Sequence, residues 1–231
     1  MINIIKGKTV DYHNLPYGFI TQKHQNLITN VGETKKAPRA SVLDMSKVGM
    51  PSYDSYFQSL ENSTLVDIVS PGILAETSRG CWWGEKQHCT FCGLNGSTMT
   101  HRSKQPEVAL KEFEYQSNRY NLNKIMVVDN ILPVNYMNTL LPALAEKKEF
   151  SIFYETKANL KRPHVEAIAN AGIKWIQPGF EGLHDDFLKA IRKGTTAIQN
   201  LAALKWCRSY GVRVTWNFLC GLPNDEESWY E

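Results

Sequence analysis

The chain has 231 residues, of which 42% are hydrophobic and 11% aromatic, so it can bury a core and is not expected to be disordered. Its net charge of +3 comes from 26 basic and 23 acidic residues spread along the chain, and this gives no reason to expect nucleic acid or a membrane surface as partner. No apolar run reaches the roughly 18 residues of a membrane span, and the first residues lack the long apolar region of a signal peptide, so we expect a cytoplasmic protein.

The chain divides into two unlike parts. Residues 1–70 mix short apolar stretches with turn-rich ones such as NLPYG and NVGETKKAPRAS, without sustained periodicity, and are predicted to be an N-terminal extension or linker. From residue 71 onward, short apolar runs alternate with amphipathic segments, which is typical of βα units.

Five strands are predicted in this second part, at residues 72–78, 124–130, 150–156, 173–179 and 212–221. The helix after the first strand is expected to start at a Ser103 cap, because a proline and early glutamates follow it. Further helices are predicted at 135–148, 161–172, 183–194 and 195–211, three of them closing on a glycine. Helical crossovers between strands indicate a parallel sheet, either a barrel or an open doubly wound sheet.

Each predicted strand runs into polar residues at its carboxyl end, where the chemistry of a βα barrel collects. Any one of them could be an ordinary helix cap or loop residue, but the pattern recurs at every strand and favours a partial (β/α) barrel of about five units. The residues are Thr77, Ser78 and Arg79; Asp129 and Asn130; Glu155, Thr156 and Lys157; Gln177 and Glu181; and Asn217 and Cys220.

Three of the five cysteines, Cys81, Cys89 and Cys92, lie within twelve positions after the first strand. In a reducing compartment such a cluster is more typical of a metal site than of disulfides. Structural zinc sites and electron-transfer iron–sulfur clusters use four ligands, and only a Cys3His zinc site with His88 or His101 could be completed locally. Three thiolates on a [4Fe-4S] cluster leave one iron open to a substrate or cofactor.

This loop resembles that of the radical S-adenosylmethionine (SAM) enzymes, with seven residues rather than three in the first gap. The CX7CX2C spacing in ETSRGCWWGEKQHCTFCGLNG, followed by HRSK, VVDN, YETKANL, GIKWIQPGFEGL, RKGTTAIQNLAALKWC and WNFLCGLP, resembles radical SAM maturases of ribosomally made peptides. The likeness extends from about residue 50 to residue 223.

The resemblance implies a [4Fe-4S] cluster on Cys81, Cys89 and Cys92, with SAM chelating the fourth iron and being cleaved to methionine and a 5′-deoxyadenosyl radical. It implies further SAM contacts, each of which has a plain structural alternative. They are Phe91 beside the adenine, Asp129 and Asn130 near the amino group, Glu181 near the ribose, and Lys157 and Arg192 near the carboxylate.

The expected partners are a precursor peptide and an electron donor such as flavodoxin or ferredoxin, and the modification would be C-methylation or another radical reaction. Such enzymes usually carry an N-terminal doubly wound domain for cobalamin; residues 1–48 are too short for it and resemble its end, so use of cobalamin stays open. The sequence also reads as a fragment that stops before a sixth strand. A zinc-binding module and an inactive truncated fragment are therefore the alternative interpretations.

Overall fold

The computed structural model describes residues 41–93, 99–223 and 225–230. The chain separates into two units at Leu43 and Asp44, and nearly all of the first unit lies outside the described residues, including most of the predicted remnant of a cobalamin-binding domain. The description therefore concerns the second unit. No helix in the described part is long and apolar enough to cross a membrane.

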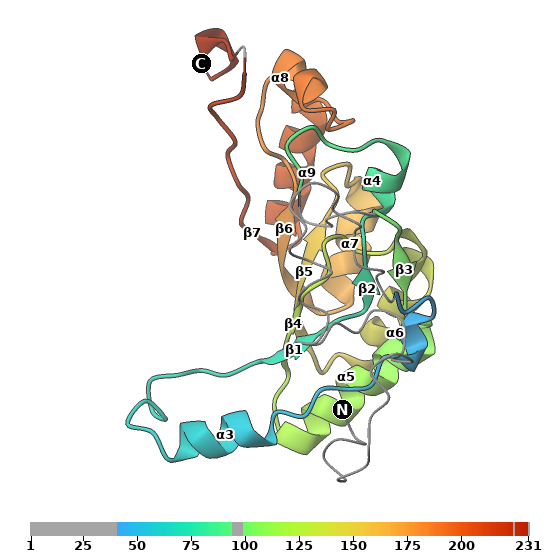
Figure 1. The fold of residues 1–231 in the computed structure, drawn as a ribbon, viewed down its shortest axis with the longest axis vertical. Helices are drawn as coiled ribbons and strands as arrows, with labels where there is room; N and C mark the ends of the chain where they lie inside the picture. The colour runs from blue at the N-terminus through green and yellow to red at the C-terminus, as the bar shows by residue number, and fades with distance from the viewer. Residues whose placement is uncertain (1–40, 94–98, 224, 231) are drawn as a thin grey trace, which may run out of the picture. The chain divides into compact units, whose positions relative to one another are not determined.

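A five-stranded, fully parallel sheet forms the centre of the second unit (Figure 1). Its strands lie in chain order: β1 (Ile73–Ala75), β4 (Lys124–Val127), β5 (Ser151–Thr156), β6 (Ile173–Pro178) and β7 (Arg213–Val214). The prediction of a mixed α/β fold with a partial barrel is confirmed. Within the described residues the sheet stays open and no closed barrel is found.

Each crossover between neighbouring strands contains helix. The helices are α5 (Pro106–Tyr120), η3 (Val134–Asn138) with α6 (Leu140–Lys147), α7 (Arg162–Asn170), and α8 (Asp185–Ala190) with α9 (Ala197–Ser209). Thr196 starts α9 with a capping box in which its side chain accepts from the Gln199 N–H. Gly172 follows α7 in the left-handed conformation (φ 78°), as the predicted helix end required.

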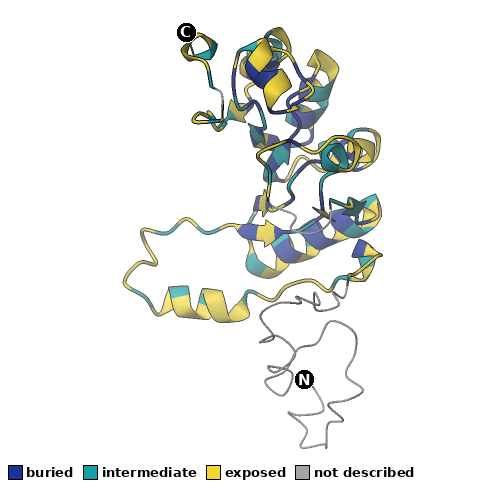
Figure 2. Ribbon diagram, turned by 45° about the horizontal axis from the view of Figure 1, so that its top comes forward, coloured by how far each residue is buried: buried dark blue, intermediate teal, exposed yellow. Residues whose placement is uncertain are grey.

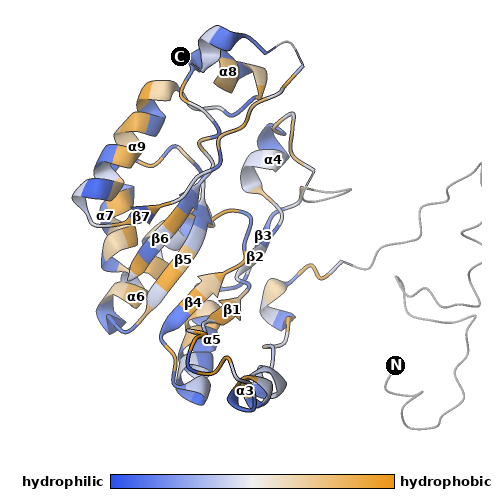
Figure 3. Ribbon diagram, turned by 90° about the vertical axis from the view of Figure 1, so that its left-hand side faces the viewer, coloured by the Kyte–Doolittle hydropathy of each residue, from blue (hydrophilic) through white to orange (hydrophobic). Residues whose placement is uncertain are grey.

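Alternation along the strands decides which side of the sheet the helices cover. In β5, Ile152, Tyr154 and Thr156 are buried, whereas the residues between them are only partly buried. The buried side packs into one apolar core with α5, α6, α7 and α9, and these helices run beside the strands in Figure 3. In Figure 2, dark residues lie on the strands and these helices, and a second group lies at α8.

The cysteine loop enters through a second, two-stranded antiparallel sheet. β2 (Ser78–Arg79) pairs with β3 (Arg102–Ser103) on either side of the loop. The predicted first strand, 72–78, is therefore two short strands in different sheets. Ser103 lies in β3, so the prediction that it caps the next helix was wrong; α5 begins at Pro106 and Gln105 makes no side-chain cap.

Residues 44–70, predicted as part of an irregular linker, contain a 3-10 turn, η2 (Met45–Lys47), and helix α3 (Asp54–Glu61). α3 has no buried residue and is almost wholly exposed in Figure 2. It is held at its start, where Asp54 accepts from Arg119 of α5 at 2.6 Å and from the Tyr120 hydroxyl at 2.9 Å. Local periodicity did not predict this helix because contacts to α5, rather than burial of its own face, hold it.

Candidate functional site

A cavity of about 380 Å³ lies at the carboxyl ends of the strands, beneath the cysteine loop. Its walls come from the cysteine loop, from the ends of β4, β5 and β6, and from the segments after α8 and β7. The lining residues are Cys81, Trp83, Cys89, Phe91, Cys92, Asn130, Ile131, Glu155, Thr156, Lys157, Gln177, Pro178, Gly179, Glu181, Lys193 and Asn217.

The cysteine loop is held to its own far end by backbone contacts. The Cys81 N–H donates to the Met99 carbonyl at 3.0 Å, and Gly80 takes a positive φ of 82° where a Cβ would come within 2.1 Å of the Thr100 oxygen. Cys81 then precedes a short helix, α4 (Trp82–Lys86), and its sulfur accepts from the Gly84 N–H at 3.4 Å. Only glycine fits at position 80, because the backbone of Met99 and Thr100 passes against it.

All three loop thiols line this cavity, whereas Cys207 is buried inside α9 and Cys220 is exposed. Burial raises the pKa of the Cys89 thiol, and the nearby Lys193 and Lys157 charges oppose that rise. In the part of the chain that the structure describes, no three Cys, His, Asp or Glu side chains stand close enough to hold a metal ion. The thiols thus share one cavity without being preassembled. Three thiols that line one cavity are a donor set that fits an iron–sulfur cluster with an open iron.

The alternative Cys3His zinc site finds no support in the cavity, because neither predicted histidine lines it. The His88 Nε2 lies 2.9 Å from the Cys92 carbonyl oxygen. His101 is partly buried, which lowers its pKa.

Lys157, at the end of β5, is almost fully buried. Its ammonium lies 4.3 Å from the ring centroid of Trp83 and donates to the Lys193 carbonyl. Burial, together with the charge of Lys193, lowers the pKa of Lys157 to about 8, although Cys89, Cys81 and Glu181 act in the opposite direction. Lys157, one of the predicted site residues, thus lies in the cavity wall.

A second buried ammonium, that of Lys193, was not predicted. Its Nζ lies 2.9 Å from Oε1 of Glu181 and 5.6 Å from the ring centroid of Phe91. It therefore joins two of the predicted site residues, one from the cysteine loop and one from beyond β6. The only hint in the sequence is a lysine two residues before a Thr-Thr helix cap, and this is too common a pattern to single it out.

Asp129 does not line the cavity. Its carboxylate is buried below it and accepts from the Thr77 N–H at 2.7 Å, from the Thr77 hydroxyl, and from the Ser78 hydroxyl at 2.8 Å. Burial raises its pKa to about 6 despite these hydrogen bonds. The structure places Asp129 where it joins the end of β4 to the start of the cysteine loop, and places its neighbour Asn130 in the cavity wall.

Arg192 is likewise outside the cavity. It is exposed, has a positive φ of 54°, and lines a separate hollow between the end of α8 and the start of α9. Its carbonyl accepts from the Trp83 indole N–H at 3.4 Å and lies 3.9 Å from the Cys89 sulfur. The backbone of Arg192 thus supports the cysteine loop, while the ammonium that enters the cavity belongs to the next residue.

Four further strand-end residues also lie in the cavity wall. Glu155, Thr156, Gln177 and Asn217 all line the cavity, and burial together with the Glu181 charge raises the pKa of Glu155.

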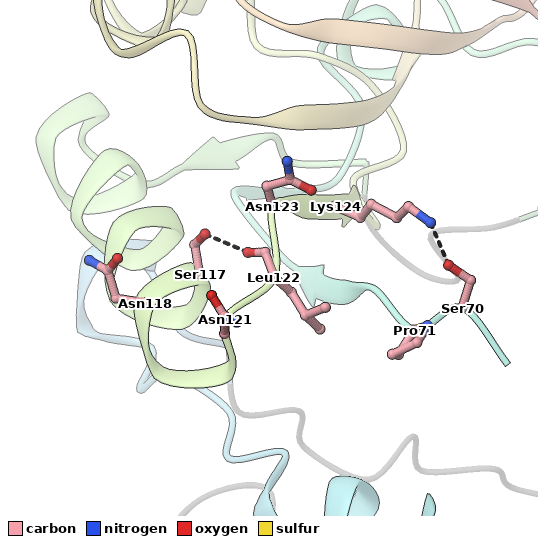
Figure 4. Close-up of a pocket in the computed structure, with 8 residues that line it drawn as sticks. All are labelled: Ser70, Pro71, Ser117, Asn118, Asn121, Leu122, Asn123 and Lys124. Carbon is pink, nitrogen blue, oxygen red and sulfur yellow. Dashed lines mark hydrogen bonds between the residues drawn. The ribbon is translucent and has the colours of Figure 1, made fainter. Parts of the chain in front are cut away.

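A polar hollow of about 420 Å³ at the opposite, amino end of β4 contains no cysteine (Figure 4). There Lys124 donates to the Ser70 hydroxyl at 2.5 Å, beside the side-chain amides of Asn118, Asn121 and Asn123. The three loop thiols, Lys157 and Lys193 lie at the carboxyl end.

Comparison with known proteins gives a consistent result. The family model described as the radical SAM superfamily matches residues 75–231. The "Uncharacterized methyltransferase PH0819" of Pyrococcus horikoshii is 24% identical over 193 residues, which is 81% of this chain and 40% of that protein. The chain spans 38% to 53% of the length of the curated relatives it matches.

Two solved structures share the fold. One is the cobalamin-dependent S-adenosylmethionine radical enzyme OxsB with aqua-cobalamin bound, with a TM-score of 0.67, 20% identity, and coverage of 94% of this chain and 31% of that one. The other is the radical S-adenosylmethionine methyltransferase TsrM of Kitasatospora setae, with tryptophan substrate and a SAM analogue, with a TM-score of 0.58, 15% identity, and coverage of 68% and 32%. With the family model matching residues 75–231, which include the whole cysteine loop and every strand end, the chain belongs to the radical SAM superfamily.

Proposed function

We propose that this chain is the SAM-cleaving portion of an enzyme that modifies a ribosomally made precursor peptide, by C-methylation or by another radical reaction. The observation that supports this most directly is the meeting of Cys81, Cys89 and Cys92 with the ends of β4, β5 and β6 around one cavity. In the proposal these three thiols hold a [4Fe-4S] cluster, which with SAM supplies one-electron cleavage of the sulfonium.

The side chains around the thiols suit the polar groups of SAM. The ammonium groups of Lys157 and Lys193 bring positive charge to the cavity, and this favours the thiolate form of Cys89 and attracts a carboxylate. Glu181 and Asn130 offer oxygen acceptors for the amino group or the ribose hydroxyls. Trp83, Phe91 and Ile131 supply apolar walls that keep water from the reacting atoms.

The substrate class and the type of transfer are the finer part of the proposal. The peptide follows from the CX7CX2C sequence resemblance. Methyl transfer is supported by the similarity to PH0819 and TsrM, which are named as methyltransferases, and use of cobalamin by the similarity to the cobalamin-dependent enzyme OxsB. A low-potential electron donor such as flavodoxin or ferredoxin would complete the reaction, and a reducing cytoplasm suits both thiols and cluster.

Product analysis after anaerobic iron–sulfur reconstitution tests the proposal. The protein is incubated with SAM and dithionite, with or without added cobalamin, and the products are separated by liquid chromatography and mass spectrometry. We expect 5′-deoxyadenosine from the wild type and from Cys207→Ala, and none from Cys92→Ala. Additional S-adenosylhomocysteine only with cobalamin would support methyl transfer; absence of both products from wild type that contains the cluster would refute the activity.

A further inference from the structure

Lys193 carries a buried ammonium group that forms an ion pair in the cavity wall. Its side chain is 9% exposed and that of its partner Glu181 is 12% exposed, so the ion pair is largely removed from water. A buried ammonium is tolerated only when it is paired. The backbone of Lys193 is fixed as well, because its N–H donates to the Leu188 carbonyl of α8 at 2.9 Å. The backbone therefore fixes the direction from which the Lys193 ammonium approaches the Glu181 carboxylate.

Glu181 is held in a backbone conformation that glutamate rarely adopts. Its φ is 63°, which costs of the order of 1–2 kcal/mol for a residue with a Cβ. The segment after β7 holds it there, since the Leu219 N–H donates to the Glu181 carbonyl at 2.9 Å and Phe218 bridges to it. This conformation places the carboxylate in the cavity wall beside Lys193.

Gly179 leaves room for the pair. A Cβ at this position would lie 2.5 Å from the Lys193 Nζ and 3.2 Å from the Glu181 Oε1. The obstructing atom is the far end of a flexible side chain, so an alanine here can be accommodated if the ammonium moves away. Gly179→Ala is thus a way to displace the ammonium without changing its charge.

We propose that Lys193 is a positioning residue that holds the Glu181 carboxylate at the end of β6 and ties it to Phe91 of the cysteine loop. Lys193 engages Oε1, and Oε2 is left to accept a hydrogen bond from a hydroxyl or ammonium group of bound SAM. The Lys193 contact to the Phe91 ring sets the distance between that acceptor and the loop that carries the thiols. This inference rests on the proposed binding of SAM.

The test is the dissociation constant of SAM for the reconstituted protein, measured by equilibrium dialysis, together with KM and kcat for 5′-deoxyadenosine formation. Partners that orient a metal ligand typically contribute 10- to 100-fold to metal affinity, and we take the same scale for a carboxylate that binds SAM. We expect Lys193→Met and Gly179→Ala each to raise the SAM dissociation constant and KM by about tenfold or more, with kcat changed less than about threefold. Lys193→Arg restores part of the affinity because it keeps the charge.

Lys189→Met is the matched control. Lys189 lies on α8, its side chain is 76% exposed, and its ion pair with Asp186 is on the surface, so we expect unchanged SAM affinity. The Glu181→Gln/Lys193→Met double variant should bind SAM no more weakly than the weaker-binding single variant. The two effects should not add, because both substitutions disrupt the same Lys193–Glu181 ion pair.

Iron content, the spectrum of the cluster and circular dichroism are recorded for every variant. Wild type that contains the cluster and does not bind SAM overturns the proposed function itself. Wild type that binds SAM, with Lys193→Met and Gly179→Ala folded, loaded and equal to it in affinity, overturns the positioning role alone. If Lys193→Met does not fold, the SAM affinities of Gly179→Ala and Lys193→Arg are compared with that of the wild type instead. Wild-type affinity in Gly179→Ala then overturns the positioning role.

Discussion

The buried ammonium of Lys157 lies 4.3 Å from the ring centroid of Trp83, the second residue after Cys81. Gly194 lies against the same indole, because a Cβ at this position would come within 2.2 Å of the ring. The strand-end lysine and the cysteine loop are thus joined through one aromatic side chain. The position of that side chain depends on a glycine from beyond α8.

Gly194→Ala should displace Trp83 and loosen the cysteine loop. The added methyl overlaps the indole and also meets a positive φ of 67°, so we expect a loss of roughly 1–3 kcal/mol in the free energy of unfolding. Cys89, now 8% exposed, should be alkylated by iodoacetamide several-fold faster in the apoprotein, as followed by peptide mapping.

Gly211→Ala is its control, because Gly211 has a similar φ of 69° but no atom within 4 Å of the added Cβ. It should lose stability through backbone strain alone and leave the Cys89 alkylation rate unchanged. Equal acceleration in both variants would contradict a specific role for the Trp83 contact.

The buried ion pair between Lys104, just after β3, and Glu112 of α5 should be costly to break by removing one partner alone. Both side chains are at most 3% exposed, and the Lys104 carbonyl accepts from the Tyr136 hydroxyl at 2.8 Å. Removing one charge strands the other, so Glu112→Ala should cost about 3–5 kcal/mol in urea unfolding. Lys104→Met/Glu112→Leu should recover most of the loss, and a double variant as unstable as the single one would contradict this explanation.

Asp129 should make the stability of the apoprotein depend on pH. Its pKa is raised from 3.8 to about 6 in the folded state, so folding takes up a proton between these values. Its contribution to the free energy of unfolding therefore falls by about 3 kcal/mol as the pH rises from about 4 to 6. Above pH 6 this contribution is constant. Asp129→Asn, in which the neighbouring hydroxyls can still find partners, should flatten that part of the profile in urea unfolding from pH 4 to 7. An unchanged slope would mean that another group titrates.

Sequence reasoning located the parallel strands well, because buried parallel strands are short apolar runs followed by polar residues. β4, β5 and β6 lie within their predicted ranges. The first and last predicted strands were too long, since the hydrogen-bonded part of β1 is only Ile73–Ala75 and that of β7 only Arg213–Val214. The apolar pattern of a sequence predicts which residues are buried, but it does not specify where the hydrogen-bonded pairing of two strands ends.

The candidate site could be predicted as a region, although not residue by residue. Spacing indicated the three cysteines, and strand ends indicated Asn130, Lys157 and Glu181, all of which line the cavity. Arg192 and Lys193 are adjacent, and which of them faces inward depends on the left-handed turn at Arg192, which no local pattern signals. Asp129 also follows a strand, but the alternation of side chains that begins in β4 turns its carboxylate away from the cavity, where it accepts from the Thr77 N–H.

The central claim is that Cys81, Cys89 and Cys92 hold a cluster with one iron open to SAM. The most direct test is the electron paramagnetic resonance spectrum of the reduced, reconstituted protein before and after addition of SAM, in the wild type, Cys89→Ala and Cys207→Ala. We predict a cluster spectrum that SAM changes in the wild type and in Cys207→Ala, and no cluster in Cys89→Ala. Bound zinc without iron, or a cluster spectrum that SAM leaves unchanged, would contradict the claim.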